Sequence, residues 1–101
     1  MNNPPLIPYI LRSRADHYCK TMAQLAGVDP VAESRCRAVV TARTLVAYKL
    51  LLDGFTEHAV GATLGWDHST INHYRNTAPA MLQAPGYDAE RELWQSFNQA
   101  I

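Results

Sequence analysis

The fold of this chain follows from residues 55–74, FTEHAVGATLGWDHSTINHY. It contains two apolar stripes at helical spacing, separated by a short link that begins at Gly65. Thr56 and Asp67 each stand where a helix N-cap is expected, and apolar residues flank each of them as in a hydrophobic staple. Two short helices with about three residues between them must meet at a steep angle. We therefore predict a helix-turn-helix.

Further helices are predicted on both sides of this motif. Apolar positions recur at helical spacing over residues 9–26, and Gly27 follows where a helix usually ends. A long, mostly apolar helix is predicted over residues 38–52. Asp88 is expected to cap a last amphipathic helix over residues 88–100. The chain should therefore be an all-α domain of about five helices.

Prolines set two of the predicted boundaries. Pro79 should end the second helix of the motif shortly before it, because proline lacks the N–H that a helix interior needs, so the motif should span residues 56–78. Three prolines near the N-terminus predict an extended arm over residues 1–8. The remaining residues, 9–101, should form a single helical domain.

The composition of the chain limits the classes of protein to which it can belong. Of its 101 residues, 48% are hydrophobic and 18% are charged, which suits a folded domain. Its formal net charge of zero excludes binding to nucleic acid through bulk positive charge. No apolar run reaches the ~18 residues of a membrane span, and the N-terminus lacks the layout of a secretory signal. We expect a cytoplasmic protein with no membrane partner.

The positive charge is concentrated in one segment. Residues 34–52 contain four basic side chains and no acidic one. Such a segment beside a helix-turn-helix can neutralise phosphates and release counterions. The alternative is an ordinary solvated helix face. The basic residues expected to contact DNA are Arg35, Arg37, Arg43 and Lys49.

The second helix of the motif should present a polar outer face. Its predicted buried stripe contains Ile71, Tyr74 and Ala78, which places the opposite stripe at i, i+3, i+4 and i+7. That stripe consists of polar residues that suit hydrogen bonding to base edges in the major groove, whose width admits an α-helix. An exposed surface helix is the alternative. The residues of the outer stripe are Ser69, Asn72, His73 and Asn76.

Catalysis and metal binding are not expected. Asp67, His68 and Ser69 are the residue types of a nucleophile triad, but consecutive helical residues point about 100° apart and no nucleophile elbow accompanies them. Cys19 and Cys36 belong to no C-x-x-C pair, so no structural zinc site is expected. We predict a protein that is not an enzyme, without cofactor, metal or small-molecule substrate.

Two motifs stand in a specific order, ARTLVAY at residues 42–48 and LGWDHSTINH at residues 64–73. Together with the basic SRCR at residues 34–37, they resemble the C-terminal DNA-binding domain of the bacterial chromosomal replication initiator, DnaA. The similarity runs from about residue 22 to residue 81. The resemblance implies an all-α, TrpR- and DnaA-like fold. Trp66 stands where the family usually has arginine, so the family's target sequence is not implied.

The resemblance also implies roles for particular residues. In the family, the arginine near the start of the long helix enters the minor groove, which carries over to Arg43. The Asp-His-Ser-Thr tetrad of the family reads base edges in the major groove. This role carries over to Asp67, His68, Ser69 and Thr70.

Together, these patterns predict sequence-preferring binding of double-stranded DNA, as a transcriptional regulator or replication-associated factor of bacterial or phage origin. His73 would join the tetrad in the major groove, and amide hydrogens at the start of the Thr56 helix would contact phosphate. The alternative is a helix-turn-helix-shaped protein-interaction module, favoured by the zero net charge, by Trp66 and by the apolar C-terminal helix. That last helix could support a homodimer or close the core.

Overall fold

The structure, a computed structural model, describes residues 7–101, and these form five helices and no strand. This confirms the prediction of an all-α fold with about five helices. In chain order they are α1 (Ile7–Ala26), α2 (Arg37–Leu52), α3 (Glu57–Leu64), α4 (His68–Gln83) and α5 (Asp88–Ala100).

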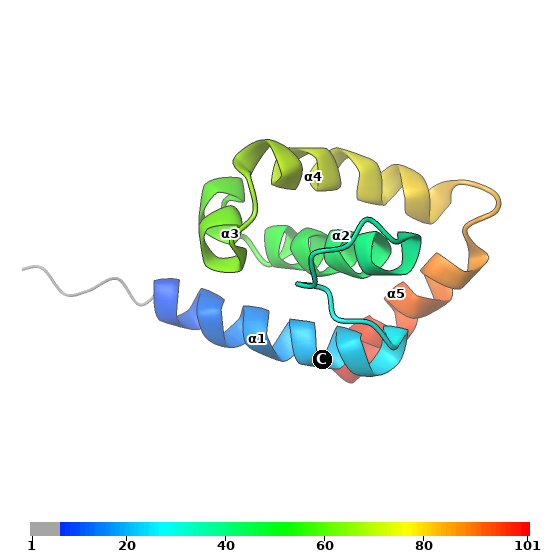
Figure 1. Cartoon of the computed structure of the whole chain (residues 1–101), viewed down its shortest axis with the longest axis horizontal. Helices are drawn as coiled ribbons and strands as arrows, with labels where there is room; N and C mark the ends of the chain where they lie inside the picture. The colour runs from blue at the N-terminus through cyan, green and yellow to red at the C-terminus, as the bar shows by residue number, and fades with distance from the viewer. Residues whose placement is uncertain (1–6) are drawn as a thin grey trace, which may run out of the picture.

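Helix α2 lies at the centre of the molecule. Figure 1 shows α1 on one side of it and α4 on the other, with the short α3 crossing at one end. Its sequence explains this place, because α2 contains no glycine or proline and its side chains Leu45, Val46 and Leu50 are completely buried. Burial of each such side chain contributes about 1.5 to 3 kcal/mol. Helices α1, α3 and α4 pack against α2, which leaves one face of α4 at the surface of the molecule.

Helix α5 closes the core at the end opposite α3. Phe97 is completely buried and meets the ring of Tyr18 from α1 edge-on, with 5.5 Å between ring centroids. Leu93 and Trp94 also pack against the core. The apolar stripe of this helix is therefore used within the chain, as core closure requires. A homodimer through α5 stays a prediction.

Helix α5 spans residues 88–100 as predicted, but Asp88 is not its N-cap residue. Tyr87 is the N-cap residue and makes no side-chain cap, whereas Asp88 is the first residue within the helix and pairs with Arg91. An acidic side chain in the first turn interacts favourably with the positive end of the helix dipole. Asp88 therefore stabilises the helix start by its charge rather than by capping.

The prediction that Pro79 ends the second helix of the motif is wrong. Helix α4 continues through Pro79 to Gln83, so the motif extends past residue 78. A proline in a helix interior costs about 3 kcal/mol. Tertiary packing offsets this cost, because Ala78 is completely buried and Met81 and Leu82 pack against the core on the far side of the proline.

The predicted boundary between the N-terminal arm and the first helix is also wrong. Residues 7 and 8 belong to the first turn of α1, and residues 1–6 of the arm lie outside the described residues. Proline is tolerated in a first turn, since the N–H that it lacks has no helical partner there. Helix α1 ends at Ala26 as predicted, where Gly27 takes a left-handed φ of 72°.

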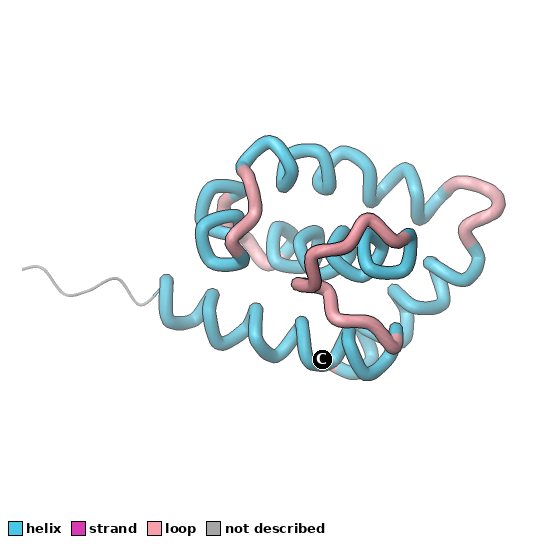
Figure 2. The backbone as a smooth tube through the Cα atoms, viewed as in Figure 1, coloured by secondary structure: helices cyan, strands magenta, loops and turns pink. Residues whose placement is uncertain are grey.

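The loop over residues 27–36 passes across α2 before that helix begins, as Figure 2 shows. Its first turn is closed by Asp29, whose carboxylate accepts a hydrogen bond of 3.0 Å from the N–H of Val31. The N–H of Ala32 donates to the carbonyl of Asp29 at 3.1 Å. The loop thus has a defined course and brings Arg35 to one side of α4.

Candidate nucleic-acid interface

The link between α3 and α4 sets the position of the exposed start of α4. Gly65 ends α3 with a left-handed φ of 75°, and the N–H of Trp66 donates to the carbonyl of Gly61 at 2.9 Å. Asp67 follows as the N-cap residue of α4, as predicted, but its side chain makes no capping hydrogen bond. The Asp67 carboxylate is therefore exposed at the tip of the helix, beside the exposed His68 and Ser69.

The outer face of α4 is the polar stripe that periodicity predicted. Ile71, Tyr74 and Ala78 are buried on the inner side. The residues of the opposite stripe are all exposed: Ser69, Asn72, His73 and Asn76. They interact along the helix, since the amide of Asn76 donates to Asn72 at 3.3 Å. The face carries hydrogen-bonding groups over two turns.

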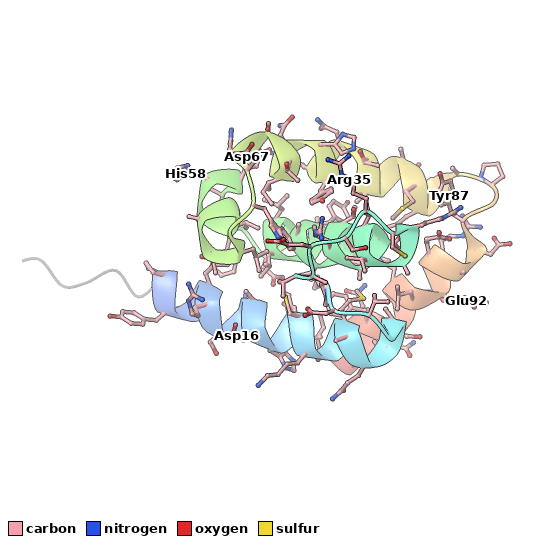
Figure 3. The ribbon with its side chains drawn as sticks, viewed as in Figure 1. Asp16, Arg35, His58, Asp67, Tyr87 and Glu92 are labelled. Atoms are coloured by element: carbon pink, nitrogen blue, oxygen red, sulfur yellow. The ribbon has the colours of Figure 1, made fainter. Side chains whose placement is uncertain are left out.

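A groove runs along one side of this face. Its rim joins Arg35, from the loop before α2, to Ser69, Thr70 and His73 of α4. Its apolar lining includes Val40 of α2. Figure 3 shows Arg35 extending from the loop toward α4, and Asp67 at the start of that helix. Arg43 of α2 also lines the groove, so the structure brings together five of the predicted DNA-contacting residues from three separate segments.

The other side of the start of α4 is held by Glu57, the first residue of α3. Its carboxylate lies 2.7 Å from Arg75, 3.2 Å from the amide of Asn72 and 3.3 Å from the ring of His68. The hydrogen bond from Arg75 is the main reason that the pKa of Glu57 lies below its ordinary value. We call Glu57, His68, Asn72 and Arg75 the α3–α4 brace. His68 therefore contacts Glu57 at the helix tip where a base contact was predicted.

The side chain of Arg43 is half-buried and makes hydrogen bonds within the protein, and it also lines the groove. Its guanidinium donates to the carbonyls of Pro30, Ala32 and Ser34 at 3.1, 2.5 and 3.4 Å and lies over the ring of Trp66. Contact with a minor groove would require these interactions to break. Minor-groove contact by Arg43 stays a prediction.

Arg37 is also engaged within the protein. It donates to Glu90 of α5 at 2.9 Å and lies over the ring of Tyr87. Glu90 is nearly buried, at 9% exposure, and so depends on this partner. Arg37 stabilises the packing of α5 on α2, and phosphate contact would compete with this role.

Lys49 and Thr56 lie apart from the groove. Lys49 is in the last turn of α2, six residues from Arg43 and hence about 120° around the helix from it. The hydroxyl of Thr56 accepts from the N–H of Ala59 at 3.1 Å, which confirms the predicted cap of α3. Glu57 follows at once in the same turn, and its negative charge opposes a phosphate there.

Two residues of the brace were not predicted as functional. Glu57 and Arg75 are charged residues within the motif, and Arg75 lies on the same side of α4 as His68, seven residues earlier. An acidic residue at the start of the first helix and a basic residue two turns into the second are the signal that could have identified this pair.

Three further observations apply to the molecule as described. Within residues 7–101, no group of three or more His, Cys, Asp or Glu side chains is placed to hold a metal ion. None of the five helices has the length and apolar character needed to cross a bilayer. Comparisons of the chain with protein-family models, curated proteins and solved structures find no match.

Proposed function

We propose that this chain binds double-stranded DNA with some sequence preference, with the outer face of α4 in the major groove and Arg35 on a neighbouring phosphate. The observation that carries the proposal is the groove in which Arg35 lies beside Ser69, Thr70 and His73. A basic side chain next to an exposed polar helix combines phosphate contact, which gives affinity, with base contact, which gives preference.

The chemistry of the outer face suits base readout. Serine, asparagine and histidine side chains can donate and accept hydrogen bonds, and the major groove offers both kinds of partner. The face is exposed along the molecule's edge, where α4 has no helix on its outer side (Figure 1). Ordinary exposed helices favour Glu, Lys and Arg, whereas this one presents few charges. The helix can therefore approach a duplex without strong repulsion.

The roles differ among the predicted residues. Ser69, Thr70 and His73 line the groove and are assigned to base edges or the adjacent backbone. Asp67 and His68 are assigned to the exposed helix tip. Arg43 and Arg37 are left out of the direct contacts because their guanidinium groups are bound within the protein. A role in transcription or replication rests on the resemblance to the DnaA domain alone.

The test is the salt dependence of binding to a mixed-sequence duplex, measured by fluorescence anisotropy. Each phosphate contact should contribute about −0.9 to the log-log slope of affinity against salt. Arg35→Gln should weaken binding and reduce the magnitude of the slope by about 1. The matched control is Arg12→Gln, an exposed arginine of α1 on the far side of α2, which should leave both unchanged.

A protein-interaction module is the second candidate, and a specific observation favours it. Two of the four basic side chains of residues 34–52 make hydrogen bonds to other parts of the protein, and the net charge of the chain is zero. An interaction module would show no duplex binding even at about 50 mM salt, or a flat salt response. If duplex binding is found, selection of fragments from a random duplex library gives the site and its symmetry together.

A further inference from the structure

The contacts of Arg43 lie outside its own helix. Its Nε donates to the carbonyl of Pro30, and Nη2 donates to those of Ala32 and Ser34. These three carbonyls belong to alternate residues of one loop. A planar guanidinium can donate in several fixed directions at once, whereas an ammonium is a point donor. The course of this loop therefore depends on an arginine at position 43.

The same guanidinium also reaches the link of the helix-turn-helix. Its Cζ lies 5.5 Å from the centre of the Trp66 ring. The backbone of Trp66 is fixed against α3, because its N–H bonds to Gly61 and its carbonyl lies so close that a Cβ at Gly61 would be 2.6 Å from it. Arg43 thus connects the loop over residues 30–34 to the point where α4 begins.

Arg35 directly follows the last carbonyl that Arg43 holds. On its other side, the N–H of Cys36 donates to the hydroxyl of Ser34 at 3.1 Å. Arg35 and Arg43 together line a hollow beside Trp66, and both also line the groove beside the outer face of α4. The backbone that carries Arg35 is therefore held in place between the loop and the helix.

We propose that Arg43 is a positioning residue: by holding the loop over residues 30–34 and stacking on Trp66, it places Arg35 beside the outer face of α4. The inference rests on the proposed function, since it assigns Arg35 to a phosphate of the bound duplex. Insertion of Arg43 into a minor groove would leave three carbonyls without their donor. Arg43 acts through Arg35 and makes no DNA contact of its own.

A double-mutant cycle tests this coupling. Binding of a mixed-sequence duplex and its salt slope are measured for the wild type, Arg35→Gln, Arg43→Lys and the double variant. Arg43→Lys retains the charge but loses the multiple carbonyl contacts, so it should weaken binding about tenfold and reduce the slope magnitude by about 1, as Arg35→Gln does. Added to Arg35→Gln, the substitution Arg43→Lys should change neither the affinity nor the salt slope. An equal loss in both backgrounds would show an independent DNA contact and overturn the inference.

Hydrogen exchange separates this inference from the proposed function. Amides of the loop, including those of Val31, Ala32 and Cys36, should exchange faster in Arg43→Lys, while circular dichroism confirms that the variant is folded. Trp66→Phe, a milder change, should give a smaller increase, and Arg12→Lys should give none. If the wild type binds no duplex, the proposed function fails. The exchange data still show whether Arg43 holds the loop over residues 30–34. Unchanged exchange in Arg43→Lys would overturn the inference.

Discussion

Two charged side chains hold the start of α4 from two sides, and they do so with different chemistry. On the loop side, Arg43 contacts three backbone carbonyls and the ring of Trp66. On the α3 side, Glu57 contacts Arg75, Asn72 and His68. Arg43 therefore has neutral partners, whereas two partners of Glu57 carry or can carry a charge.

This difference determines how each side responds to its surroundings. Hydrogen bonds to carbonyls and stacking on an aromatic ring change little with salt or with mild changes of pH. An ion pair near the surface is screened by salt and is lost when its carboxylate is protonated. The loop side therefore gives the interface a fixed geometry, and the α3 side makes it responsive to conditions.

The loop side and the α3 side both depend on the close approach of the link between α3 and α4 to α3. Gly61→Ala should therefore have the largest effect on stability. A Cβ at this position would lie 2.6 Å from the carbonyl oxygen of Trp66, and backbone must move to admit it. The higher helix propensity of alanine offsets about 1 kcal/mol of the cost of this backbone movement. We expect a net loss of about 2 kcal/mol in the free energy of unfolding, measured by urea titration.

The control for this substitution is Ala62→Ser, at the exposed position next along α3. It introduces no clash and should change stability by less than about 0.5 kcal/mol. A Gly61→Ala protein as stable as the wild type would show that the link can move away from α3 freely. The two sides would then be independent of each other.

The contrast itself is tested by the salt dependence of stability. Arg43→Lys should lower the free energy of unfolding by about 1 to 2 kcal/mol at both low and high salt, because its partners are neutral. Glu57→Gln should have a smaller effect, which decreases as salt is added. Both are measured by urea titration at about 0.05 and 1 M sodium chloride, the range over which the Debye length falls to about 3 Å.

Arg91→Lys is a useful reference for the first of these variants. Arg91 donates to the carbonyl of Ala84 at 2.8 Å, and so it shares the use of carbonyl acceptors, but it also pairs with Asp88. The loss of stability in Arg91→Lys should therefore depend in part on salt. If Arg43→Lys proved as sensitive to salt as Glu57→Gln, the distinction between the two sides would be wrong.

The sequence predicted the features that depend on neighbouring residues, and it missed the contacts that join distant segments. The buried stripe of α4, the cap by Thr56 and the end of α1 at Gly27 follow from residues a few positions apart, and they are confirmed. The partners of Arg37 and Arg43 are up to 53 residues away and depend on how the helices pack. Helical continuation through Pro79 depends on packing too. An arginine pattern alone does not distinguish a side chain that hydrogen-bonds to another part of the protein from one free to contact DNA.

The smallest expected effect is a pH dependence confined to the α3 side. The pKa of Glu57 lies below its ordinary value of 4.5 in the folded chain, chiefly because of the hydrogen bond from Arg75. The unfolded chain therefore takes up this proton first as the pH falls. The contribution of Glu57 to stability should be fully present above about pH 5.5, decrease below the ordinary pKa and vanish below the folded one.

This contribution is the difference in unfolding free energy between the wild type and Glu57→Gln, followed by urea titration from about pH 6 to pH 3. Other carboxyl groups titrate equally in both proteins and cancel in the difference. The same difference taken between the wild type and Arg43→Lys should stay constant over this range, because no partner of Arg43 titrates in it. A constant difference for Glu57→Gln as well would mean that the carboxylate gains nothing from Arg75, and the two sides of α4 would respond alike.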